Sequence, residues 1–530
     1  GGGATGAPTL ASRRRMLGLA DPRRSVAPMT TQAGQAPVLS DDEFPDNPWP
    51  ALWALVVGFF MILVDVSIVS IATPALMESF DAGIEPVLWV TSAYLLAYAV
   101  PLLITGRFGD RFGPKRLYLT GLAIFTLASL ACGLAPTIGW LIGARVVQGL
   151  GASMMTPQTM AVITRTFPPA RRGSAMALWG ATAGVAFLVG PLLGGLLLDS
   201  WGWEWIFFIN VPVGILGFVA AARLVPQLQR HAHQMDWVGV GLSAVGLFLV
   251  IFGLQEGESN DWGQLAGPIT VPALIGLGVL VLVGFVGWQA RGPAEPLVPL
   301  GLFRDRNFSL SNLAITTMGL SVTAMMFPLL VWLQSVRGYT PTEAALLMAP
   351  QAIASIALAR PVGQLVDRIH PRVLPALGLG GFAVTLFVLS RLMTPDSSIV
   401  AVCVAMTFIG VTGACIWGPL ATTANRNLPI HLAGAGSGIY NTTRQVGSVI
   451  GSAAIAALMS ARIAAHLGPQ AAERFGSGEG SAAAGPAALP PQVAEALSSA
   501  FAESLLMPAA ALVVGAAAAL ALEQMRHQRG

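Results

Sequence analysis

The sequence predicts an all-α membrane protein in which two six-helix halves flank a two-helix insert, giving fourteen transmembrane helices. Hydrophobic residues make up 54% of the chain and charged residues only 10%, whereas soluble domains average about 25% charged residues. The hydrophobic residues fall into runs of roughly 17–25 residues, long enough for a helix to cross about 30 Å of hydrocarbon. The runs are continuous rather than alternating, which favours helices over a membrane barrel.

A charged turn that occurs twice indicates an internal duplication. Between two apolar runs the chain reads Gly106–Arg116 (GRFGDRFGPKR), and later, again between two apolar runs, it reads Gly363–Arg372 (GQLVDRIHPR). Both turns follow the pattern G-x-x-x-D-R-x-x-P-[K/R]. Internal repeats that meet at a site near the membrane midplane are typical of secondary transporters.

The order of the segments follows from this repeat. Residues 1–48 lack an apolar run, so we expect a disordered cytoplasmic tail rather than a signal peptide. We place the first half at 49–224, the insert with its linkers at 225–307 and the second half at 308–525, with an extracytoplasmic Ala/Gly/Pro-rich loop at about 461–499. The predicted spans begin near Trp49, Pro86, Leu117, Ile138, Gly173, Trp205, Asp236, Ile269, Phe308, Thr342, Arg372, Ser398, Ala433 and Phe501.

The charges of the predicted turns give the orientation. With an even number of spans, most basic turn residues fall on one side and most acidic ones on the other, and the basic side of a membrane protein faces the cytoplasm. Both termini are therefore expected in the cytoplasm, with the protein in the inner or plasma membrane. The basic side includes Arg107, Lys115, Arg165, Arg172, Arg223, Arg230, Arg304 and Arg426, and the acidic side includes Glu78, Asp81, Glu204, Glu256 and Asp396.

Two charged residues inside the predicted spans point to proton chemistry. Asp65 is the one acidic residue deep in a span, and a charged side chain there costs about 2.5–3.5 kcal/mol unless it is compensated or protonated. Arg145, in the middle of the fourth span, stays charged and needs a partner. We therefore predict a coupling between Asp65 and Arg145 that acts as a proton switch. The alternative is that a hydrogen-bonded Asp65 only fixes helix packing.

Further polar and aromatic residues are candidates for a substrate cavity. Arg444, beside Asn441, has no acid of its own in its span, so it lines a water-filled cavity or binds helix-end carbonyls. Arg360 is expected to have a structural role at a helix end. The candidate cavity residues are Trp89, Tyr94, Tyr98, Gln148, Phe187, Phe327, Trp332, Trp417, Asn441 and Arg444, and for each aromatic residue ordinary packing is the alternative.

The fifth span is rich in glycine. Small residues at a spacing of four let two membrane helices approach closely, and a proline inside a helix bends it. The residues expected to provide this packing are Gly184, Gly190, Pro191, Gly194 and Gly195.

Several function classes are disfavoured by the sequence. The chain contains no phosphate-binding loop of the Walker type, no H-E-x-x-H motif, no nucleophile elbow and no zinc-type spacing, so neither an ATP-driven pump nor an intramembrane hydrolase is expected. The three cysteines lie inside apolar runs and are interpreted as packing residues. The basic residues lie in turns between spans, which argues against nucleic acid as a partner. We expect no enzyme activity, no metal and no cofactor.

These motifs, in this order, resemble the major facilitator superfamily, in particular the fourteen-helix drug:proton antiporters of the EmrB/QacA type. The resemblance extends over about Trp49 to Gln524 and implies the major facilitator fold. It implies proton coupling by Asp65 and Arg145. It also implies that Asp110, with Arg111, belongs to a charge network that locks the cytoplasmic side. With the repeated second turn included, the expected gate residues are Gly106, Asp110, Arg111, Gly113, Lys115, Arg116, Asp367 and Arg368.

The expected function is proton-driven efflux of amphipathic small molecules such as drugs and dyes, powered by the proton gradient across the bilayer. A dedicated exporter of a native lipid, siderophore or secondary metabolite is the alternative within the same class. A receptor or scaffold that transports nothing is a third reading, and the embedded charges argue against it because a scaffold gains nothing from charges in lipid.

Overall fold

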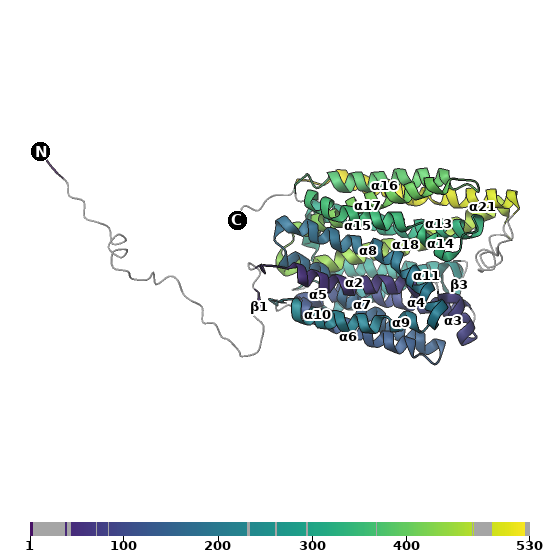
Figure 1. Cartoon of the computed structure of the whole chain (residues 1–530). Helices are drawn as coiled ribbons and strands as arrows, with labels where there is room; N and C mark the ends of the chain where they lie inside the picture. Colours follow the sequence, from purple (N-terminus) through teal and green to yellow (C-terminus); the bar gives the residue numbers. More distant parts are fainter. Residues whose placement is uncertain are drawn as a thin grey trace. The chain divides into compact units, whose positions relative to one another are not determined.

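Nearly all of the described chain is helical, as the long apolar runs predict (Figure 1). The residues from Val38 onward form one compact unit, and most of the predicted tail at 1–48 lies outside the described residues. The computed structural model describes residues 1–3, 38–39, 44–69, 72–82, 84–230, 234–259, 262–292, 295–366, 368–468, 470 and 490–524.

The first set of helices, α2 to α10, carries the first charged turn. Pro101 lies between α4 and α5, and the two helices meet at a bend of 46°. Gly113 has φ +93°, a backbone conformation that suits glycine and ends α5 before Pro114 begins α6. The elements are α2 (Trp49–Val69), α3 (Thr73–Phe80), α4 (Ile84–Ala99), α5 (Leu102–Phe112), α6 (Pro114–Gly133), α7 (Ile138–Thr166), α8 (Pro169–Trp201), α9 (Trp205–Phe208) and α10 (Asn210–Leu224).

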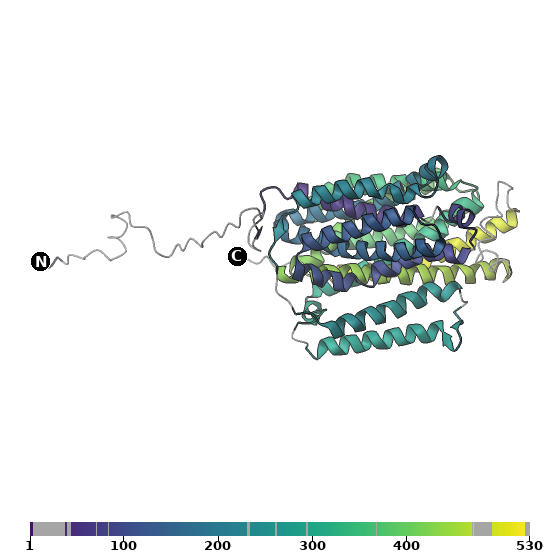
Figure 2. The same cartoon turned by 90° about the horizontal axis from the view of Figure 1, so that it is seen from below.

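The insert forms a helical hairpin beside the main bundle, visible as the separate teal pair in Figure 2. Its helices are α11 (Trp237–Ser259) and α12 (Val271–Ala290), joined through the short strands β3 (Gln264–Ala266) and β4 (Ile269–Thr270). A parallel pair of short strands, β1 (Val38–Leu39) and β2 (Gln227–Leu228), precedes the hairpin. Apolar residues of α11 pack against α4 and α18. The insert therefore touches both sets of helices.

The second set of helices follows the insert, and its last loop is shorter than predicted. Helix α18 continues to Leu467 and α21 begins at Pro491, so both ends of the predicted loop 461–499 are helical. Alanine-rich sequence favours helix, and a proline suits its first turn. The elements are η2 (Leu300–Arg304), α13 (Arg306–Val331), the π-helical turn η3 (Trp332–Val336), α14 (Pro341–Leu346), α15 (Ala349–Val366), α16 (Val373–Leu392), α17 (Ile399–Arg426), η4 (Ile430–Leu432), α18 (Ala433–Leu467), α21 (Pro491–Ser504) and α22 (Leu506–Leu520).

The span count agrees with the prediction of a polytopic helical protein. Within the described residues, 12 helices are long and apolar enough to cross a membrane, and 13 if the bent pair α4–α5 is one span. Helix α7 is 29 residues long and stands outside that count. Adding α7 is consistent with the fourteen predicted spans.

The two charged turns belong to helices that make corresponding contacts. Helix α5, which leads into the first turn, packs against α18, and α15, which leads into the second, packs against α8. A Cβ atom added to Gly106 would lie 2.5 Å from the carbonyl oxygen of Gly434, and one added to Gly363 would lie 2.6 Å from Cα of Ser174. Both glycines therefore permit backbone contact between the first and second sets.

Candidate functional site

Asp65 and Arg145 form an ion pair that is sealed from solvent. Both side chains have no exposed surface, and Nη1 of Arg145 donates a hydrogen bond to Oδ2 of Asp65. Asp65 comes from α2 and Arg145 from α7, so the pair joins two helices of the first set. A buried charge costs several kcal/mol in desolvation unless it is paired and hydrogen-bonded, and here both requirements are addressed by neighbouring groups.

Three polar side chains complete the surroundings of the Asp65 carboxylate. Nε2 of Gln148 donates to Oδ1 of Asp65 at 2.9 Å, and Nδ2 of Asn210 donates to the same oxygen at 3.0 Å. Both amides also donate to Oγ of Ser129, at 3.2 and 3.0 Å. The cluster of Asp65, Ser129, Arg145, Gln148 and Asn210, called the coupling cluster below, draws on α2, α6, α7 and α10.

Arg145 also contacts α4, α9 and its own helix: Nη1 donates to Oε1 of Gln148 at 2.8 Å, and Cζ lies 5.7 Å from the centroid of the Phe207 ring. Its Nε donates to the carbonyl oxygen of Val90 at 3.1 Å, and its Cζ lies 4.1 Å from the centroid of the Tyr94 ring. Nη2 has no hydrogen-bond acceptor among the described residues. A cation over an aromatic face is attracted by the ring quadrupole, most strongly where water is excluded. The Tyr94 ring therefore stabilises the Arg145 cation without contributing a carboxylate.

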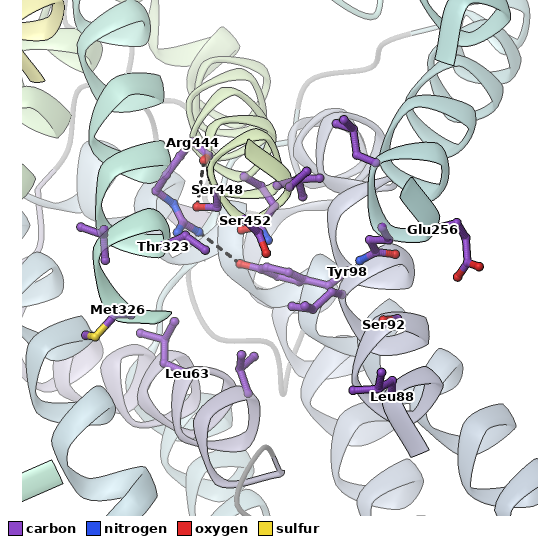
Figure 3. Close-up of a pocket in the computed structure, with 18 of the residues that line it drawn as sticks. Leu63, Leu88, Ser92, Tyr98, Glu256, Thr323, Met326, Arg444, Ser448 and Ser452 are labelled. Carbon is purple, nitrogen blue, oxygen red and sulfur yellow. Dashed lines mark hydrogen bonds between the residues drawn. The ribbon is translucent and has the colours of Figure 1, made fainter. Parts of the chain in front are cut away.

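A cavity of about 490 Å³ lies close to the coupling cluster without including it. Its lining residues come from α2, α4, α11, α13 and α18, so both sets and the insert contribute. Ile62, Leu63 and Val66 on α2 lie within one helical turn of Asp65 and face the cavity. Leu88 and Glu256 place part of it near the ends of α4 and α11 that lie away from Asp110. Figure 3 shows Leu63 and Met326 on one wall and Tyr98 and Arg444 on another.

Two tyrosines connect the cavity with the coupling cluster. The rings of Tyr94 and Tyr98 stack with centroids 6.2 Å apart, and Tyr98 lines the cavity. The hydroxyl of Tyr98 is 3.2 Å from Oγ1 of Thr156 and accepts a hydrogen bond from Nη2 of Arg444 at 3.5 Å. The groups from Asp65 through Arg145, Tyr94 and Tyr98 to Arg444 are thus in contact in series.

The predicted cavity residues divide into those that line this cavity and those that do not. Trp89, Tyr98 and Arg444 line it. Tyr94 and Gln148 belong to the layer behind it. Trp332 is fully buried and donates to Oγ of Ser498 at 3.2 Å, and Phe327 is half exposed. Phe327 lies on α13 and Trp332 on η3. Apolar residues cover all sides of this segment, so the sequence does not indicate which side faces inward.

Two further predicted residues lie in the closed part of the bundle. Asn441 is fully buried and donates to the carbonyl oxygen of Ser437 at 2.9 Å. Trp417 lines a much smaller cavity between α8, α13, α15 and α17. The side chain of Phe187 lies outside the described residues.

At the end of the bundle where α5 stops, Asp110 binds the beginning of α18. Its Oδ1 accepts a hydrogen bond from the backbone N–H of Gly434 and its Oδ2 from that of Ala435, both at 2.9 Å. The free N–H groups and the dipole at a helix N-terminus favour a carboxylate at this place. Together with the close approach of Gly106, this contact closes the bundle between the cavity and the Asp110 end.

The other gate residues have separate partners. Arg107 and Arg165, not Arg111, are the buried arginines whose charges act on Asp110. Nη2 of Arg107 lies 4.0 Å from Oε2 of Glu295 in the linker after α12. Arg111 instead lies over the ring of Phe112, and Nζ of Lys115 donates to the carbonyl oxygen of Ala222 at 2.7 Å. Arg116 and Arg368 are exposed. Asp367 lies outside the described residues.

The glycines of α8 face different neighbours. A Cβ atom on Gly190 would lie 1.9 Å from Oγ of Ser67 on α2, whereas Gly184 and Gly195 face Ser355 and Thr342 at ordinary distances. Gly194 is buried, and Pro191 lies within the helix. Close approach is therefore required at Gly190, on the side of α2 that leads to Asp65.

Asn210 and Ser129 are functional candidates that sequence reasoning missed. An asparagine at the start of an otherwise apolar segment is a polar group that needs a partner in lipid, which is a signal that could have identified Asn210. Ser129 gave none, because serine is common in membrane helices. Among the described residues, no group of three or more His, Cys, Asp or Glu side chains is placed to hold a metal ion.

Comparison with known proteins gives the family. The Major Facilitator Superfamily profile matches residues 55–452. An uncharacterized MFS-type transporter of Mycobacterium tuberculosis is 50% identical over 483 residues, which are 90% of this chain and 81% of the relative. The multidrug resistance protein Stp of the same species is 34% identical over 416 residues, 78% of this chain and 76% of Stp.

A solved structure supports the fold. The structure of a proton:xylose symporter of the major facilitator superfamily aligns with a TM-score of 0.57 and 14% identity, covering 82% of this chain and 94% of the symporter. The sequence prediction of the major facilitator fold is confirmed by these matches. With its repeated charged turns, its helical bundle and a match over most of its length, the chain belongs to the major facilitator superfamily.

Proposed function

We propose that the protein is a proton-coupled antiporter that exports amphipathic small molecules from the cytoplasm. The observation that carries the proposal is the sealed ion pair of Asp65 and Arg145, which lies behind the stacked rings of Tyr94 and Tyr98 from a cavity large enough for such a molecule. The multidrug resistance relative supports export of drug-like compounds. We infer that the proton gradient supplies the energy, so no cofactor or chemical step on the substrate is needed.

The coupling mechanism follows from what holds the cluster together. A proton that reaches Asp65 neutralises the carboxylate and removes the charge that the cation of Arg145 and the amides of Gln148 and Asn210 now stabilise. Because these groups come from α7 and α10, and Arg145 also binds α4, protonation loosens the packing of α2 against all three. The cavity wall on α2 then changes with the charge of Asp65. If the proton and the substrate each stabilise a different conformation of the protein, the two are exchanged across the membrane.

The gate and the orientation belong to the same proposal. The Asp110 end is taken as cytoplasmic because basic turn residues gather there. The state described here is then closed to the cytoplasm and has its cavity toward the opposite side. The segments 49–224 and 308–525 act as the two halves that rock against each other, and residues 1–48 form a cytoplasmic tail.

The proposal is tested by reconstitution. The full-length protein in liposomes loaded with an amphipathic dye should release the dye when the lumen is made alkaline relative to the bath, and protons should enter as the dye leaves. No dye release with a pH gradient, in liposomes that contain folded protein, would contradict the proposal. A drug-susceptibility panel with a deletion strain would separate broad efflux from export of one native metabolite.

A further inference from the structure

Within the part of the chain that the structure describes, the cation in the cavity wall has no acid paired with it. Arg444 is the basic residue among those that line the cavity. Its Nη2 donates to the Tyr98 hydroxyl at the long distance of 3.5 Å, and its Nε is buried without an acceptor. Among the described residues, no carboxylate lies within ion-pair distance of Arg444. Arg145 differs because Asp65 pairs with it directly and its Nε donates to the carbonyl oxygen of Val90.

We propose that Arg444 is the anchoring site for an anionic group on the substrate, and that the exported molecules are amphipathic acids carrying a carboxylate or a similar anion. The proposal rests on the proposed function in one respect only, namely that the cavity receives the substrate. Arginine stays charged at every physiological pH. An arginine within a membrane span is found where it contacts a partner or water. The cavity gives an incoming anion access to Arg444.

The geometry of hydrogen bonding favours an anion over a neutral acceptor. A guanidinium presents parallel N–H donors that match the two oxygens of a carboxylate, and such charge-assisted bonds are about twice as strong as neutral ones. Arg444 is only partly buried and lines the cavity, so an arriving carboxylate meets its guanidinium there. A cationic substrate would instead meet a like charge in a poorly screened space.

The rest of the wall suits the apolar body of such a molecule. Leu63, Val66, Val322 and Met326 provide apolar surface on α2 and α13, and Trp89 adds an aromatic face. Figure 3 shows Leu63 and Met326 below the guanidinium of Arg444.

The acid of the cavity wall does not neutralise Arg444. Glu256 on α11 lies on the far side of Tyr98 from Arg444 in Figure 3, and it has a partner of its own. The cavity therefore has a positive end near Arg444 and Tyr98. An amphipathic acid fits with its anion at that end and its apolar body against α2 and α13.

Binding of three probes that share one scaffold tests the proposal. Pyrenebutyrate, pyrenebutanol and pyrenebutylammonium are titrated into the purified full-length protein in detergent without a pH gradient, with probe anisotropy as the readout. The carboxylate should bind at least about tenfold more tightly than the ammonium compound, and Arg444→Gln should weaken carboxylate binding about tenfold while changing pyrenebutanol binding less than about twofold. Arg444→Lys should retain part of the preference. Arg391→Gln, which removes an exposed cation outside the cavity, is the matched control and should change nothing.

Equal or tighter binding of the ammonium compound, or unchanged carboxylate binding in folded Arg444→Gln, would overturn the proposal. If Arg444→Gln does not fold, the charge preference of the unmodified protein and the Arg444→Lys variant decide. Because binding is measured without a gradient, failure of the substrate assignment is distinct from failure of proton coupling. Coupling fails if none of the three probes is released from liposomes under a pH gradient.

Discussion

Arg145 places its guanidinium carbon 4.1 Å from the centroid of the Tyr94 ring while it donates to Asp65. Tyr94 stacks on Tyr98, which lines the cavity. The proton site and the cavity are thus separated by two aromatic rings rather than shared. A change in the charge of Asp65 is expected to reach the cavity through this stack and through α2.

Removal of one member of the ion pair should cost more stability than removal of both. Arg145→Gln leaves the Asp65 carboxylate buried without its cation, and breaking a buried pair in this way costs about 3–5 kcal/mol. Asp65→Asn combined with Arg145→Gln leaves two amides and should recover much of that loss. Thermal unfolding in detergent measures both. A double variant less stable than Arg145→Gln alone would show that the pair is not what stabilises the cluster.

The ring of Tyr94 should matter and its hydroxyl should not. The hydroxyl has no hydrogen-bond partner in the described structure, so Tyr94→Phe should keep stability and transport. Tyr94→Leu removes the aromatic face from Arg145 and should cost about 2 kcal/mol together with most of the pH-driven transport. Unfolding temperature and dye release are the measurements. Equal behaviour of the two variants would argue against the cation–aromatic contact.

Gly106→Ala should disfavour the state closed at the Asp110 end. The added Cβ would lie 2.5 Å from the carbonyl oxygen of Gly434 and 2.9 Å from Cα of Gly438, and backbone atoms cannot move aside cheaply. A cysteine at Ser452, in a background with Cys403 and Cys415 changed to serine, reports the cavity through its rate of reaction with an impermeant maleimide. The maleimide is added on the side away from the Asp110 end. Because the variant spends less time with its cavity open to that side, the labelling rate should fall.

The control for this prediction is Gly380→Ala on α16. A Cβ there meets nothing within 4 Å, so labelling of the cysteine at position 452 should stay the same. A labelling rate in Gly106→Ala equal to that of the control would contradict the assignment of Gly106 to the gate.

Asp236, just before α11, should stabilise the insert in a pH-dependent way. Partial burial raises the pKa of Asp236, but hydrogen bonds from Gly239 N, Trp288 Nε1 and Gln289 Nε2 more than offset this, so the pKa lies below the ordinary carboxyl value. A lowered pKa means that the ionised form stabilises the fold above the ordinary value of about 3.9 and that this stability is lost as the pH falls through the folded-state pKa.

Asp236→Asn should therefore unfold at a lower temperature than the unmodified protein at neutral pH, and the two should converge in strong acid. Differential scanning fluorimetry across that range is the measurement. A difference that persists unchanged in strong acid would assign the effect to packing rather than to charge.

The fold could be predicted from the sequence because its signals are long and repeated. Runs of apolar residues fixed the helices, and the turns at Gly106–Arg116 and Gly363–Arg372 gave the duplication. The exact helix boundaries were harder to predict from the local sequence. The boundary at Pro491 was missed because an Ala-, Gly- and Pro-rich stretch is compatible with both loop and helix.

The site could be predicted only where charge was informative. Asp65 and Arg145 stood out because charges in lipid demand partners, and the structure places them together. Phe327 and Trp332 could not be placed, because an evenly apolar helix does not reveal which face turns inward. Arg107 and Arg165 rather than Arg111 act on Asp110, a distinction that depends on how α5 rotates against its neighbours.

Replacement of Asp65 is the most direct test of whether this carboxylate carries the coupling proton. Asp65→Asn keeps the size of the side chain but cannot release or accept the coupling proton, and Glu343→Gln makes the same chemical change at an acid outside the coupling cluster. In liposomes with an alkaline lumen, Asp65→Asn should lose pH-driven dye release while still binding the dye, and Glu343→Gln should keep it. Normal pH-driven release by folded Asp65→Asn would contradict the assignment of Asp65 as the proton site.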